Sequence, residues 1–182
     1  AAKWAASHGY VVLSYSGLGF GADPQSGRRG SDCKISLDDR QHDGAAGKQL
    51  VDFLGGLKAA DDGTKVDYVV KDRVAHDGKV HPGDVRVGMV GGSYGGQIQF
   101  AVAALDPRVD TIVPLITWND LSYSLAPNNA TLAPGSVSYA VPGTEKIDWT
   151  TAFFGLGIAD GVQGAAMAQD PTRLGPCPNF LD

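Results

Sequence analysis

Residues 85–105, VRVGMVGGSYGGQIQFAVAAL, decide the fold that this sequence predicts. The apolar stretch 85–90 is typical of a buried β-strand, and 97–105 is apolar enough for a buried helix. The glycine-rich turn 91–96 between them places Ser93 in the pattern G-x-S-x-G. On a strand–turn–helix junction this pattern indicates a nucleophile elbow, a strained turn that lifts a serine hydroxyl above the end of the sheet.

The residue types in this elbow can each be explained by the physical role of their position. Gly91 and Gly95 are expected to let the strand and the helix pack closely, because a Cβ at either position would clash. The N–H groups at a helix N-terminus favour negative charge that develops nearby. The main-chain N–H of Tyr94 is therefore the expected oxyanion donor, with Ser93 as the nucleophile. The alternative is a glycine-rich turn whose serine has no chemical role.

The flanking segments continue an alternation of helices and strands. Residues 10–15 (YVVLSY) and 109–116 (VDTIVPLI) each predict a buried strand. Ala1–His8 is expected to be the end of a helix, with Gly9 as the residue that closes it. An apolar face predicts another helix over 38–57. This alternation is typical of a parallel sheet flanked by helices, so the predicted fold class is α/β.

The helix predicted over 38–57 leads into a polar stretch. Ser36 or Asp38 can cap its start, because both carry a side-chain oxygen that accepts from a main-chain N–H. Residues 60–83 are expected to form an insertion on a loop, with a small hairpin at 65–80. The apolar face of the helix comprises Ala46, Leu50, Phe53, Leu54 and Leu57.

Composition excludes several classes of protein. The chain has 182 residues with 43% hydrophobic and 19% charged residues, which fits a globular domain with a core. A net charge of −5 without a basic stripe argues against a nucleic-acid partner. No apolar run approaches the roughly 18 residues of a membrane span. Cys33 and Cys177 could form one bridge or pair elsewhere, so the cellular compartment and the oligomeric state stay open.

Three stretches carry a resemblance to a known family. VGMVGGSYGG (87–96), DPRVDTIVPLITWNDL (106–121) and HGYVVLSYSGLGFG (8–21) resemble the Xaa-Pro dipeptidyl-peptidase and cocaine-esterase family of α/β-hydrolases. The resemblance covers roughly residues 1–125, interrupted by 60–83. It implies a serine hydrolase that cleaves an ester or amide through an acyl-enzyme, without a metal or cofactor. It does not choose between a peptide with proline at its second position and an acyl ester as the substrate.

The resemblance also implies how the chain is organised. Residues 1–118 would form part of an α/β-hydrolase core, and 119–182 would begin a mostly helical cap. A ligand of an open α/β sheet binds outside the carboxyl ends of the strands. The residues that follow the strand 109–116 could therefore line a substrate pocket, or equally lie buried under the cap. They are Trp118, Asn119 and Tyr123.

The rest of a catalytic triad does not carry over to this sequence. The order implied by the family is serine, then an acid, then a histidine, but every histidine here precedes Ser93. Asp120 is the one aspartate considered as the acid, and a role at a loop or cap hinge is favoured for it. We therefore expect the acid and the histidine to lie beyond Asp182, and this chain alone to be inactive. The four histidines are His8, His42, His76 and His81.

Two rival features suggest other functions. Gly17–Ala22 (GLGFGA) mimics a dinucleotide fingerprint, but Pro24 and the following glycines oppose the helix that would have to start there. A nucleotide-binding module and a non-catalytic scaffold that retains the elbow stay as alternatives. Residues 76–84 contain four side chains of the kinds that bind metal ions. A solvated loop is nevertheless the favoured interpretation, because a metal site needs oriented ligands. These four residues are His76, Asp77, His81 and Asp84.

Overall fold

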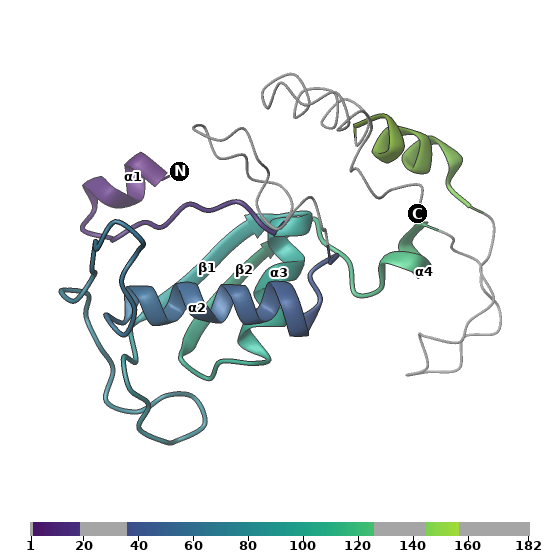
Figure 1. Ribbon diagram of the computed structural model, residues 1–182. Coiled ribbons are helices and arrows are strands. Elements are labelled where there is room, and N and C mark those ends of the chain that lie inside the picture. The colour runs from purple at the N-terminus through teal and green to yellow at the C-terminus, as the bar shows by residue number, and fades with distance from the viewer. Residues whose placement is uncertain (1, 19–35, 126–144, 157–182) are drawn as a thin grey trace. The chain divides into compact units, whose positions relative to one another are not determined.

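The computed structural model describes residues 2–18, 36–125 and 145–156 (Figure 1). The chain divides into two compact units. The first comprises 1–18 and 35–117, and the second comprises 19–34 and 118–182. The sheet and the predicted elbow both belong to the first unit.

The first unit is built on a strand–helix–strand motif. Strands β1 (Val87–Gly92) and β2 (Val109–Leu115) pair in parallel, with Met89 opposite Ile112. Helix α3 (Tyr94–Ala103) connects them. This is the parallel α/β arrangement predicted from the sequence, with β1 starting and ending two residues later than expected.

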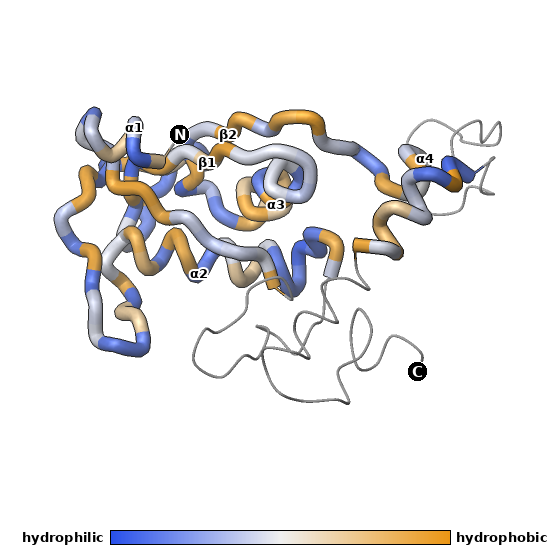
Figure 2. The backbone as a smooth tube through the Cα atoms, turned by 90° about the horizontal axis from the view of Figure 1, so that it is seen from above, coloured by the Kyte–Doolittle hydropathy of each residue, from blue (hydrophilic) through white to orange (hydrophobic). Residues whose placement is uncertain are grey.

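Two helices cover one face of this sheet. Helix α3 packs on both strands and α2 (Ala45–Leu54) packs against α3, and Figure 2 shows both helices on the same side of the strands. The helices approach closely because Gly47 has no side chain. A Cβ there would lie 2.3 Å from Cγ2 of Val102. The buried apolar cluster between these elements comprises Val51, Val85, Ile98, Ala101, Val102 and Val109.

The strands are buried on one face only, so the prediction of buried strands is confirmed for one face and wrong for the other. Met89 and Ile112 pack against the core. Val90 and Val113 point the other way and are 73% and 47% exposed. Successive side chains of a strand alternate between faces, and among the described residues α2 and α3 cover one of them. Apolar letters alone do not show whether a second layer is present.

The strand predicted over 10–15 does not form. Among the described residues no strand pairs with the segment; Tyr10 N donates only to Ala5 O of α1 at 3.2 Å, and Tyr10 is 67% exposed. A β-strand is defined by its pairing, which local residue preferences do not supply. The preceding helix is confirmed as α1 (Ala2–Ser7), followed by Gly9 with φ of +86°.

The helix predicted over 38–57 starts later and buries another face. It begins as a π-helical turn, η2 (Arg40–Gly44), and continues as α2. Asp39 caps it by accepting from Gln41 N at 3.1 Å, so the expected caps, Ser36 and Asp38, are wrong. The fully buried positions of α2 are Gly47 and Val51, because α3 packs at this glycine. Of the expected face, Ala46, Leu50, Phe53 and Leu54 are half-buried and Leu57 is exposed.

The polar insertion returns to the core through a short antiparallel pairing. Asp72 N donates to Asp84 O at 2.8 Å, and Arg86 N donates to Val70 O at 3.0 Å. The pairing therefore joins 70–72 to 84–86, and the hairpin predicted at 65–80 is displaced. It leads directly into β1.

The described part of the second unit is helical. It contains α4 (Leu121–Leu125) and a helix over 147–156. In the parts of the chain that the structure describes, each helix is too short or too polar to cross a membrane.

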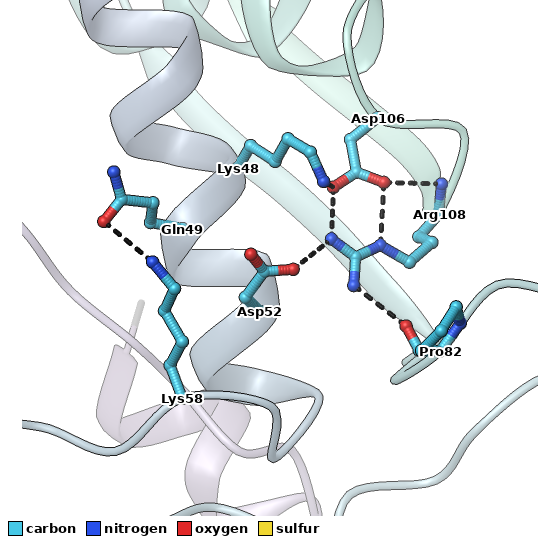
Figure 3. Close-up of polar contacts among 7 residues, drawn as sticks. All are labelled: Lys48, Gln49, Asp52, Lys58, Pro82, Asp106 and Arg108. Atoms are coloured by element: carbon cyan, nitrogen blue, oxygen red, sulfur yellow. Dashed lines mark hydrogen bonds and ion pairs between the residues drawn. The ribbon is translucent and has the colours of Figure 1, made fainter.

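An ion-pair network closes the end of the first unit opposite the elbow (Figure 3). Arg108 and Asp106 are 3% and 1% exposed, and two hydrogen bonds of 2.8 and 2.6 Å join them. Arg108 also donates to Asp52 Oδ1 at 2.5 Å and to Pro82 O at 3.1 Å. Although burial favours the neutral acid, the bonds from Arg108 hold the pKa of Asp106 below its usual value. The network joins α2, the insertion and the α3–β2 connection.

We expect Arg108→Met to destabilise the protein strongly. It leaves the buried Asp106 carboxylate without its bidentate partner, which costs about 3–5 kcal/mol. Lys58→Met is the matched control, because exposed Lys58 makes a single 3.3 Å bond to Gln49. Its expected cost is below about 0.5 kcal/mol. Urea unfolding measures both, and equal losses would contradict a central role for Arg108.

Candidate active site

Ser93 forms a one-residue turn between β1 and α3. β1 ends at Gly92 and α3 begins at Tyr94, so the turn is shorter than the predicted 91–96. Ser93 has φ of 53° and ψ of −117°, a conformation that L-residues rarely adopt. Such a position costs on the order of 1–3 kcal/mol and persists where the surroundings impose it. The backbone at Ser93 is thus strained, as the sequence predicts for the turn between this strand and this helix.

Main-chain bonds on both sides hold this conformation. Ser93 N donates to Leu115 O of β2 at 2.9 Å. Ser93 O accepts from Gly96 N at 2.9 Å, from Gln97 N at 3.1 Å and from Thr117 Oγ1 at 2.9 Å. Ser93 itself is exposed at the carboxyl end of β1. A nucleophile of an α/β sheet belongs at this edge.

Only part of the glycine prediction is confirmed. A Cβ on Gly91 would lie 2.5 Å from Gly95 O, so glycine is required there. A Cβ on Gly95 would meet nothing within 4 Å, so the predicted clash at Gly95 is wrong. The second required glycine is Gly96, where a Cβ would lie 2.8 Å from Thr117 Cβ. The doubled glycine of the motif was the available signal, but the packing partner is not visible in the sequence.

A buried amide braces the elbow, which sequence reasoning missed. Gln99 is 1% exposed. Its Nε2 donates to Gly95 O at 2.7 Å, with longer contacts of 3.3 Å to Gly91 O and Val113 O. Its Oε1 accepts from Val113 N at 2.8 Å. One side chain thus joins the first turn of α3 to β2. Its only sequence signal was a glutamine in an otherwise apolar helix, where Gln97 is a second one.

Two buried carboxyl groups lie behind the elbow, and sequence reasoning missed these as well. Asp38 and Asp43 are 5% and 3% exposed. The Tyr94 hydroxyl lies 3.4 Å from Asp43 Oδ2 and accepts from Asp38 N at 3.1 Å. Burial, with the nearby Asp43 charge, raises the pKa of Asp38 to about 7. Burial also raises the pKa of Tyr94 to about 12 and raises that of Tyr15, on which both carboxyl groups act.

Among the described residues, no hydrogen bond or ion pair joins any of the four histidines to Ser93. Each imidazole instead lies close to a group on its own loop or helix, or on a neighbouring strand. Across 2–18, 36–125 and 145–156, no three His, Cys, Asp or Glu side chains are grouped to hold a metal ion. The nearest partners are Trp4 O for His8 at 2.8 Å, Asp39 for His42 at 2.5 Å, Asp110 O for His76 at 3.2 Å and Asp77 for His81 at 2.9 Å.

The expected substrate residues belong to the second unit. Trp118 is half-buried, Asn119 is exposed, and Tyr123 lies in α4. Their pocket roles, and that of Asp120 as a hinge, stay predictions. The glycine loop 17–30 lies almost wholly outside the described residues, as do Cys33 and Cys177.

Comparisons with known proteins identify one family. A family model described as X-Pro dipeptidyl-peptidase (S15 family) matches residues 1–151. The match includes the elbow, the insertion and the first part of the second unit. Neither the curated proteins nor the solved structures gave a match to this chain.

We expect Gly91→Ala and Gly95→Ala to differ sharply in stability. The Gly91 variant places a Cβ against Gly95 O and should lose about 1–3 kcal/mol. The Gly95 variant meets open space within α3, where alanine is favoured by up to about 1 kcal/mol. Thermal and urea unfolding of both proteins measure the difference. A larger loss for Gly95→Ala would contradict this packing.

The raised pKa of Asp38 predicts a pH-dependent stability difference. The folded protein keeps a proton up to about pH 7 that the unfolded chain releases near 3.8, so ionisation opposes folding. Relative to the wild type, Asp38→Asn should gain roughly 2–4 kcal/mol as the pH rises from about 4 to about 7. Urea unfolding at several pH values measures this gain. Asp62→Asn, at an exposed loop residue whose pKa is lowered by its bonds to Thr64, should show no such gain.

Proposed function

This chain belongs to the X-Pro dipeptidyl-peptidase (S15) family, and from that membership we propose that it is a serine hydrolase with Ser93 as its nucleophile. The observation that carries the proposal is the backbone of Ser93, with φ of 53° and ψ of −117° between β1 and α3. A non-glycine residue in this conformation at the carboxyl end of a parallel strand is what a nucleophile elbow requires. The substrate class is an ester or amide, such as a peptide with proline at its second position.

The reaction would proceed through an acyl-enzyme. Ser93 Oγ attacks the substrate carbonyl carbon while its proton passes to a general base. The negative charge that forms on the carbonyl oxygen is received by the main-chain N–H of Tyr94, at the start of α3. Collapse of the tetrahedral intermediate releases the amine or alcohol, which takes up the proton. Water then attacks the acyl group by the same route and regenerates Ser93.

We propose that the general base is a histidine supplied from outside these 182 residues. Each of the four histidines of the chain has a local partner other than Ser93. A serine without a base within hydrogen-bond reach is a weak nucleophile. The acid that orients this histidine would lie outside the chain as well. Residues 119–182 would contribute a cap, with Trp118, Asn119 and Tyr123 toward the substrate.

A fluorophosphonate probe tests this function. In the protein isolated from its natural source, we expect covalent labelling located at Ser93 by peptide mass spectrometry. Ser93→Ala should abolish that label and leave unfolding unchanged within about 0.5 kcal/mol, since Ser93 is exposed. Absence of label at Ser93, in a sample where another serine hydrolase reacts, would refute the proposal.

The isolated 182-residue chain tests the origin of the base. It should react with the probe at least about 100-fold more slowly than the natural protein, because an unassisted serine loses most of the triad's contribution. Circular dichroism on the same sample shows that the chain is folded. An equal labelling rate would show that the base lies within this sequence.

A further inference from the structure

Tyr94 joins the candidate nucleophile to a buried acidic pair. Its main chain follows Ser93 directly, and its hydroxyl reaches η2, more than fifty residues earlier in the sequence. The hydroxyl lies 3.4 Å from Asp43 Oδ2 and accepts from Asp38 N at 3.1 Å. Asp38 N also lies 3.1 Å from Asp43 Oδ2. The three groups form a closed set in which Asp43 Oδ2 receives both donors.

The two carboxyl groups of this set are held where water does not reach. Asp38 and Asp43 are 5% and 3% exposed. Both carboxyl oxygens of Asp38 and Oδ1 of Asp43 have no hydrogen-bond partner among the described residues. Buried carboxyl oxygens without partners are costly, so the fold retains them against a considerable penalty. An ion pair on the protein surface therefore does not explain why these two carboxyl groups lie together.

Backbone strain lies at both ends of the connection. Leu37 and Asp38 have φ of 50° and 61°, in the left-handed region that non-glycine residues seldom occupy. Ser93 has φ of 53°. The bond from Asp38 N to the Tyr94 hydroxyl links the strained loop to the residue beside the strained serine. Strain at two connected positions indicates that the surroundings impose both conformations.

We propose that Asp43 is a positioning residue, which holds the Tyr94 hydroxyl and thereby fixes the main-chain N–H that follows Ser93. A side chain anchored at its far end limits rotation of its own peptide unit. The oxyanion donor must be aimed before the reaction, because reorganisation during the step costs rate. The inference rests on the proposed function, since it concerns the donor of that reaction.

The anchor, by which we mean the contact between Asp43 and the Tyr94 hydroxyl, should also depend on pH. Asp38 faces the Asp43 carboxylate from the preceding loop, Tyr94 faces both from α3, and Tyr15 faces both from the segment after α1. Of these groups, Asp38 changes charge nearest to neutral pH, at about 7. Its ionisation places a second negative charge beside Asp43 in a dry site. The Tyr94 peptide should therefore sense this titration through its hydroxyl.

The kinetic test measures the rate of fluorophosphonate labelling at Ser93 in the natural protein. Asp43→Asn and Tyr94→Phe should each slow labelling by about 10-fold, since small misplacements of a catalytic group have large effects. The double variant should be no slower than either single one, because both remove the same anchor. Asp62→Asn controls for loss of a carboxylate elsewhere and should label at the wild-type rate. Unchanged labelling in folded Asp43→Asn, or multiplying losses, would overturn the proposal.

A second readout does not depend on reactivity. In the wild-type chain, the ¹H–¹⁵N resonance of the Tyr94 amide should shift with a midpoint near pH 7. That shift should vanish in Asp38→Asn and in Tyr94→Phe, and the resonance should move in Asp43→Asn. If Ser93 takes no label but this pattern is found, the proposed function fails and the anchor stands. A Tyr94 amide that is indifferent to Asp43→Asn would refute the anchor, whatever Ser93 does.

Discussion

The fold of the first unit depends on a change from strand to helix within a single residue, Ser93. Ser93 alone separates β1 from α3, and its positive φ is what permits so short a turn. The turn brings main chains close together, which excludes a side chain at Gly91 and at Gly96. It also leaves polar main-chain atoms in a buried place, and the Gln99 amide bonds to several of them. The need for glycine at positions 91 and 96 and the bonds of the Gln99 amide thus follow from one backbone geometry.

The two ends of the strand–helix–strand motif are stabilised in different ways. At the elbow, neutral hydrogen bonds and close packing impose an unfavourable conformation. At the other end, Arg108 makes charged bonds to Asp106 and Asp52, which fix how α3 returns into β2. A buried ion pair adds little net stability but opposes any arrangement that separates its charges. The strained turn at Ser93 therefore belongs to a motif whose other end is held in one arrangement by the charged bonds of Arg108.

The acidic pair behind the elbow connects folding with the proposed chemistry. Asp38 and Asp43 are buried, and their proximity raises the pKa of Asp38 to about 7. This arrangement reduces stability once Asp38 ionises, so packing alone does not account for it. A rigid hold on Tyr94 does account for it, since a preorganised donor requires groups that cannot relax. The contacts that lower the stability of the fold when Asp38 ionises are then the same contacts that hold Tyr94 in place.

The strand–helix–strand motif, Ser93 at its turn and the family can all be recognised in the sequence. These features depend on apolar runs and on a short glycine pattern, both of which are local properties of the chain. The fold is needed to show that glycine is required at Gly91 and Gly96 but not at Gly95, that no described strand pairs with 10–15, and that the Tyr94 hydroxyl lies against Asp43. The physical reason is that a clash, a strand pairing and a buried hydrogen bond each need a second group far away in the sequence. Residue preferences carry no information on which distant group that is.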